Sequence, residues 1–182
     1  MWISQGTDYS DFELDELYTF IGRKSRTEDG ENTYICTMIS RLPRQIVAFD
    51  VNKFRTEEMF QSMVDSVNSA ETYHTDGLKT YGEVDYYPGR HNQNSLDKSD
   101  THNVESINAD LRHHIPGLRR RSRCFYRKDE TLESVLSVFA DAYNKFGTAK
   151  LKSRIPVKHK SPFPEKHLHE WKDLPFSVLD FL

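Results

Sequence analysis

The spacing of the apolar residues changes near residue 56, and this change limits the folds that the chain can adopt. Before it lie three segments with the alternating or β-branched residues typical of strands: residues 11–24, 33–40 and 45–52. A turn centred on Asp29-Gly30 and a second turn around Pro43 separate these segments. Strands joined by short turns pair antiparallel, so the pattern predicts a three-stranded meander.

The first predicted strand carries acidic residues on both of its faces. Side chains alternate between the faces of a strand, which separates two sets: Phe12, Leu14, Glu16, Tyr18 and Phe20 from Glu13, Asp15, Leu17, Thr19 and Ile21. Asp15, near the middle of this strand, is therefore predicted to point away from Glu16.

After residue 56 the apolar spacing is helical, which predicts a helix over residues 56–68. Thr56 is a good N-cap, and Glu57 and Glu58 lie near the positive end of the helix dipole. Residues 71–76 are a short strand. Because this strand follows a helix, we expect it to pair parallel to an earlier strand.

The second half of the chain is predicted to be more helical. Residues 82–103 are polar and turn-rich, and indicate an exposed, mobile loop with a short strand at residues 84–86. A helix over residues 103–115 should end at Pro116-Gly117. A further helix over residues 130–146 should have Asp129 as its N-cap and Gly147 as its C-terminal stop. We expect three regions: an N-terminal extension (1–11), a catalytic domain (12–150) and a C-terminal tail (151–182).

The predicted order of elements is β-β-β-α-β-loop-α-α. Three antiparallel strands, a helix and then a parallel strand are the topology of a ribonuclease-H-like core. We therefore expect an α/β fold with a mixed sheet, three antiparallel strands plus parallel strands, flanked by helices.

The bulk composition is that of a folded, soluble protein, with 36% hydrophobic and 29% charged residues among 182. No apolar run approaches the roughly 20 residues of a membrane span, and the N-terminus lacks the pattern of a signal peptide. Only Cys36 and Cys124 are present, which favours reduced thiols in a cytoplasmic protein over a disulfide framework.

Charge is distributed unevenly along the chain. Residues 1–100 hold 10 Lys and Arg against 18 Asp and Glu, whereas residues 101–160 hold 13 against 6. The basic residues cluster within 17 positions: Arg112, Arg119, Arg120, Arg121, Arg123, Arg127 and Lys128. Arginine binds phosphate oxygens bidentately, so we expect this cluster to bind the phosphate groups of a partner; the alternative is a solvated connector.

Three acids could form a metal site in such a core. The first and fourth strands would be neighbours, which would bring Asp15 and Asp76 together, and Glu105 stands at the start of the next helix. Carboxylates gathered in this way repel one another unless a cation such as Mg²⁺ is bound between them. The alternatives are a solvated strand residue for Asp15, an Asp-Gly turn for Asp76 and a helix-dipole partner for Glu105.

Four stretches carry a family resemblance: ELDELYTFIGRKS (13–25), YHTDGLKTYGEV (73–84), NVESINADLRHHIPGLRRRSRCFYRKDE (103–130) and VFADAYNKF (138–146). Their order and spacing resemble the catalytic core of transposases of the insertion-sequence-one family. The resemblance implies that Asp15, Asp76 and Glu105 are an Asp-Asp-Glu triad for two Mg²⁺ or Mn²⁺ ions. Ser106 departs from the family pattern, which commonly has an arginine there and so a phosphate contact.

The resemblance also implies a function. A transposase of this kind cuts transposon ends and transfers the resulting 3′ hydroxyl to target DNA. Its partners would be end and target DNA, further copies of itself, and a zinc and helix-turn-helix recognition module, separate or fused. It would act at a bacterial nucleoid, or in a nucleus as a eukaryotic derivative. Two alternatives stay open: a ribonuclease-H-like nuclease without strand transfer, and an inactive domesticated DNA-binding derivative.

Overall fold

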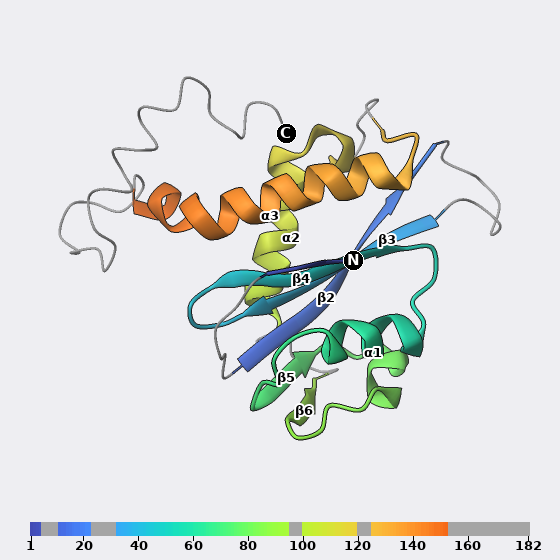
Figure 1. Cartoon of the computed structure of the whole chain (residues 1–182), viewed down its shortest axis with the longest axis vertical. Coiled ribbons are helices and arrows are strands. Elements are labelled where there is room, and N and C mark those ends of the chain that lie inside the picture. The colour runs from blue at the N-terminus through green and yellow to red at the C-terminus, as the bar shows by residue number, and fades with distance from the viewer. Residues whose placement is uncertain (5–10, 23–31, 95–99, 120–124, 153–182) are drawn as a thin grey trace.

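The computed structural model describes residues 1–4, 11–22, 32–94, 100–119 and 125–152. Its centre is a six-stranded mixed sheet in the order β1-β4-β3-β2-β5-β6 (Figure 1). The strands are β1 (Trp2–Ile3), β2 (Asp11–Phe20), β3 (Asn32–Ser40), β4 (Gln45–Asn52), β5 (Thr72–Thr75) and β6 (Arg90–Gln93). The helices are α1 (Glu57–Asp65), α2 (His102–His114) and α3 (Asp129–Lys152), with short 3-10 turns η1 (Lys79–Glu83) and η3 (Pro116–Leu118).

The predicted meander and the parallel fourth strand are confirmed. β2 pairs antiparallel with β3, and β3 pairs antiparallel with β4. β5 lies parallel to β2 on its other edge. The mixed sheet with flanking helices is the expected ribonuclease-H-like α/β fold.

Helices cover both faces of the sheet, α1 on one face and α2 with α3 on the other (Figure 1). The Thr56 hydroxyl accepts a hydrogen bond of 3.3 Å from the backbone N–H of Met59, so the predicted N-cap of α1 is confirmed. Phe12 and Leu14 of β2 pack on the α1 side, whereas Leu17 and Ile21 pack on the side of α2 and α3. The even-numbered positions of β2 therefore face α1, and the odd-numbered positions face α2.

The prediction for residues 82–103 is wrong in two respects. Val84 and Tyr86 do not form a strand but are buried in the core beneath α1. The strand is β6, which pairs parallel with β5. The chain can turn into β6 at Gly89, where a Cβ atom would collide with Ala70 O and lie 2.7 Å from the ring of Tyr73. Residues 95–99 lie outside the described residues.

The third predicted helix is longer than its sequence suggested. α3 begins at Asp129, as expected within one residue, but continues past Gly147 to Lys152. A glycine inside a helix costs only about 1 kcal/mol relative to alanine, so it does not by itself end one. The apolar stripe that includes Leu132, Leu136 and Phe139 packs on the sheet.

The N-terminal strand was not predicted, and two predicted segments lie where the structure describes no residues. β1 adds to the edge of the sheet, where the Trp2 ring stacks on Phe49 with centroids 5.5 Å apart. The predicted turn at Asp29-Gly30 and residues 153–182 of the predicted tail lie outside the described residues. Among the helices that are described, none has the length and apolar character needed to cross a membrane.

Candidate active site

The pairing of β2 with β5 determines where the predicted acids lie. Asp11 pairs with Thr72, and Glu13 pairs with His74, so paired residues differ by 61 in number. The same offset places Asp15 beside Asp76, just beyond the last paired residues. The end of the β2–β5 ladder, at the middle of β2 and the end of β5, thus brings these two acids together from positions far apart in the sequence.

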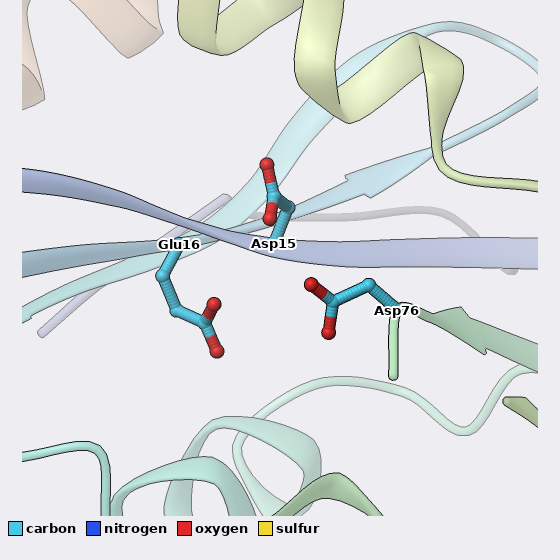
Figure 2. A group of neighbouring side chains, drawn as sticks. All are labelled: Asp15, Glu16 and Asp76. Carbon is cyan, nitrogen blue, oxygen red and sulfur yellow. The ribbon is translucent and has the colours of Figure 1, made fainter. Parts of the chain in front are cut away.

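A third acid joins them, and it is Glu16. Each of Asp15, Glu16 and Asp76 has a carboxylate oxygen within 4.8 Å of the others. Figure 2 shows Asp15 and Glu16 on opposite sides of β2, with Asp76 reaching toward both from the end of β5. The alternation predicted from the sequence is confirmed, and yet both side chains contribute to one cluster. Glu16 is not among the predicted site residues, because the motif that carries the family resemblance points to Asp15.

The cluster is electrostatically crowded. Burial raises the pKa of Asp15, and the charges of Asp76 and Glu105 raise it further. Burial, together with the charges of Asp15 and Asp76, raises the pKa of Glu16 to about 7. A cation bound among these carboxylates would relieve the repulsion between their negative charges, so the cluster is a candidate metal site.

Asp76 has a structural task as well as a place in the cluster. Its Oδ1 accepts a hydrogen bond of 2.9 Å from the backbone N–H of Leu78, which closes a turn after β5. The Asp-Gly turn interpretation is therefore confirmed. It is compatible with the cluster, since a carboxylate can accept several hydrogen bonds or ligate at the same time.

Glu105 lies in the first turn of α2, near the cluster but outside the group whose oxygens are within 4.8 Å. Its charge is close enough to raise the pKa of Asp15. One turn later, Asn108 Nδ2 donates a hydrogen bond of 2.9 Å to Asp15 Oδ2, which lowers that pKa. The face of α2 that carries Glu105 is thus tied directly to Asp15.

A buried carboxylate fastens α2 to the sheet. Glu13 is fully buried and accepts hydrogen bonds from Arg41 Nε at 2.8 Å, Asn103 Nδ2 at 2.7 Å and the backbone N–H of Val104 at 2.9 Å. No distinct pattern in the sequence indicates this role, because an acid in a strand is usually solvated. Glu13 does lie two residues before Asp15, on the same face of the strand, and this position indicates that its side chain points toward α2.

The predicted basic cluster is described only in part. Arg112 donates to the backbone oxygens of Tyr18 at 3.2 Å and Leu118 at 3.5 Å, and Arg119 donates to His113 O at 2.8 Å. Lys128 is exposed. Arg120, Arg121 and Arg123 lie outside the described residues.

Comparison with protein families decides the relationship. The family model of the IS1 transposase matches residues 11–146, about three quarters of the chain. The chain belongs to the IS1 transposase family. The match confirms the resemblance in the sequence and a role in the transposition of an insertion sequence, which is a form of DNA recombination. A comparison with curated proteins found no match.

Membership of the IS1 family bears on the site in two ways. A transposase has DNA as its substrate, so DNA is a partner of this chain. Transposases of the Asp-Asp-Glu type generally use a divalent metal, and a compact acid cluster is present where the ladder between β2 and β5 ends. The cluster offers oxygen donors alone, which suits Mg²⁺ or Mn²⁺ better than a softer metal.

Proposed function

We propose that this chain is the catalytic domain of an Asp-Asp-Glu transposase, in which Asp15, Asp76 and Glu105 hold two Mg²⁺ or Mn²⁺ ions. The observation that carries the proposal is the register of β2 and β5, which sets Asp15 beside Asp76 where the ladder between these strands ends. Divalent ions at such a site assist the attacking oxygen and stabilise the leaving oxygen of phosphoryl transfer.

Two reactions of the same kind follow from this proposal. In the first, water attacks a phosphodiester at the transposon end, and the bond to the 3′ oxygen breaks to leave a free 3′ hydroxyl. In the second, that hydroxyl attacks a target phosphodiester, forming a new strand and releasing a target 3′ hydroxyl. Neither step requires a covalent bond between protein and DNA, because both are direct displacements at phosphorus.

In this scheme the residues of the chain bind the cations and the DNA backbone and orient the metal ligands. Asp15 and Asp76 hold the cations at the end of the β2–β5 ladder, and Glu105 completes the set from α2. Asn108 keeps the Asp15 carboxylate in one orientation through its 2.9 Å hydrogen bond. The predicted DNA-backbone contacts come from Arg112, Arg119, Arg120, Arg121, Arg123 and Lys128.

The proposal extends to the assembly in which the chain works. The active form is a homo-oligomer that brings transposon ends and target DNA together. A zinc and helix-turn-helix module, fused or separate, reads the transposon ends. The complex acts at the nucleoid of a bacterium, or in the nucleus if the chain is a eukaryotic derivative.

The Asp76→Asn variant tests the proposal. The asparagine can still accept the Leu78 hydrogen bond through its amide oxygen, so the turn should persist while the negative charge is lost. We expect metal-dependent nicking of end DNA to be abolished and DNA affinity to be retained. Asp65→Asn, at an exposed position of α1, is the matched control and should nick normally. Nicking by Asp76→Asn at the wild-type rate would overturn the assignment.

Further measurements separate this function from its alternatives. Pre-cut transposon ends with free 3′ hydroxyls should be joined to target DNA by a transposase and left unjoined by a nuclease. An inactive derivative would bind DNA but show no nicking at any concentration of Mg²⁺ or Mn²⁺.

A further inference from the structure

Glu16 lies where the edge of β2 becomes open. The ladder between β2 and β5 ends at Glu13, whereas the ladder between β2 and β3 continues to Phe20. Side chains on opposite faces of a strand are normally separated by the neighbouring strands of the sheet. Beyond the last pair with β5, the carboxylates of Asp15 and Glu16 come within 4.8 Å of each other around the free edge, and Asp76 reaches the same point from the end of β5 (Figure 2).

A second observation concerns how the Glu16 carboxylate is held. The Tyr81 hydroxyl is fully buried beside it, and hydrogen bonding from this hydroxyl lowers the pKa of Glu16 against the larger effect of burial. No bond of ordinary length and angle reaches either Tyr81 Oη or Glu16 Oε1 from the described residues. Buried polar atoms are nearly always satisfied, so a buried carboxylate oxygen with only this weak partner, at an acid cluster, marks a place for a further ligand.

Tyr81 is held firmly in this position. Its ring packs against Phe60 with centroids 4.5 Å apart, and its backbone oxygen accepts a hydrogen bond of 3.1 Å from the Tyr86 hydroxyl. The hydroxyl therefore comes to Glu16 from a rigid part of the core under α1. A group fixed in this way can orient a carboxylate toward an ion, as partners of metal ligands commonly do.

We propose that Glu16 is a further ligand of the cation held by Asp15 and Asp76, and that Tyr81 is the positioning residue that orients its carboxylate. This inference rests on the proposed function, because it concerns the same site. It adds a ligand from the α1 side of the sheet, whereas Glu105 comes from the α2 side. The family triad does not include this residue.

The test measures Mn²⁺ binding by calorimetry on the full chain, without DNA. We expect Glu16→Gln to weaken Mn²⁺ binding by about 10- to 100-fold, and Tyr81→Phe to weaken it by a smaller factor. Glu57→Gln, an exposed acid on α1, is the matched control and should bind like the wild type. Asp76→Asn serves as the reference for loss of a residue of the proposed triad.

Thermal unfolding provides a second readout that a merely structural role would not reproduce. Glu16→Gln removes one of three crowded negative charges, so without metal its melting temperature should equal or exceed that of the wild type. Added Mn²⁺ should raise the melting temperature of the wild type more than that of this variant. A variant that is simply misfolded would instead melt lower in both conditions, which would overturn the inference.

The possible failures are distinguishable. If Glu16→Gln binds Mn²⁺ like the wild type while Asp76→Asn does not, Glu16 is no ligand and the proposed function stands. If neither variant changes Mn²⁺ binding, the acid cluster is not the metal site, and the inference and the proposed function both fail.

Discussion

The backbone N–H of Val104 donates a hydrogen bond of 2.9 Å to Oε2 of Glu13, which joins the first turn of α2 to β2. Glu13 lies two residues before Asp15, and Val104 directly precedes Glu105. One buried carboxylate therefore controls the spacing between two of the proposed metal ligands, although it is not itself in the cluster. Arg41 completes this link through its 2.8 Å ion pair with Glu13.

Replacing Glu13 with Gln should destabilise the fold. The amide cannot accept from three donors as the carboxylate does, and the charge of Arg41 loses its buried partner. Breaking such a pair costs about 3–5 kcal/mol, and we expect roughly 3 because Arg41 is partly exposed. Urea unfolding measures the change. Glu83→Gln, which breaks an exposed pair with Lys79, should stay within about 0.5 kcal/mol of the wild type. Equal losses in the two variants would contradict the role of Glu13.

Replacing Asn108 with Ala should reduce activity more than stability. Asp15 loses the donor that orients it, and the Thr37 hydroxyl loses its acceptor at 3.4 Å. We expect nicking to fall by about 10- to 100-fold. The free energy of unfolding should fall by about 1–3 kcal/mol, the cost of an unsatisfied buried group. Ser106→Ala, exposed on the same helix, is the control. Unchanged nicking per folded molecule would show that Asp15 needs no such support.

Replacing Gly89 with Ala should disturb the entry into β6. The added Cβ would overlap Ala70 O and approach the Tyr73 ring to 2.7 Å, so the backbone must shift. Overpacking of this kind costs about 1–3 kcal/mol in the free energy of unfolding, which urea denaturation would measure. Gly82→Ala is the matched control, because its Cβ would meet only the flexible end of Gln93 at 3.3 Å. Similar losses in both variants would contradict the close packing seen at Gly89.

Neutralising the basic cluster should weaken DNA binding in a salt-dependent way. The variant replaces four arginines with glutamine: Arg119, Arg120, Arg121 and Arg123. The slope of log K against log salt should become less negative by about 0.9 for each phosphate contact that is lost. Fluorescence anisotropy at several salt concentrations measures this slope. A double change of the exposed Lys53 and Lys145 to glutamine should leave it unaltered. If the quadruple variant kept the DNA affinity and the salt slope of the wild type, these arginines would not be the residues that bind the DNA phosphates.

Much of the scaffold could be predicted because its strands and helices have clear periods. The alternation in β2 and the capping of α1 by Thr56 are local signals, and both are confirmed. The meeting of Asp15 and Asp76 followed from topology, since β5 after a helix had to run parallel to an earlier strand. β6 was missed because Arg90–Gln93 is entirely polar, and an edge strand held by backbone pairing needs no apolar pattern.

The roles of Glu16 and Glu13 depend on where strand ladders end and where helices pack on the sheet. A local sequence pattern does not contain this information. Glu16 reaches the cluster only because the pairing with β5 stops at Glu13. Glu13 itself is buried only because α2 begins above it, with the Val104 N–H pointing at its carboxylate. In each case the residue type suggests a solvated surface, and tertiary contacts determine otherwise.

The fixed offset of 61 residues between β2 and β5 has a consequence for how the sequence can vary. A slip of one position would turn every side chain of β5 to the opposite face and carry Asp76 away from Asp15. Insertions and deletions between the two strands must therefore be absorbed in the connecting loops, never in the ladder. A molecule in which β2 and β5 paired out of register could be compact and still lack the acid cluster. The proposed activity therefore depends on these two strands aligning correctly during folding.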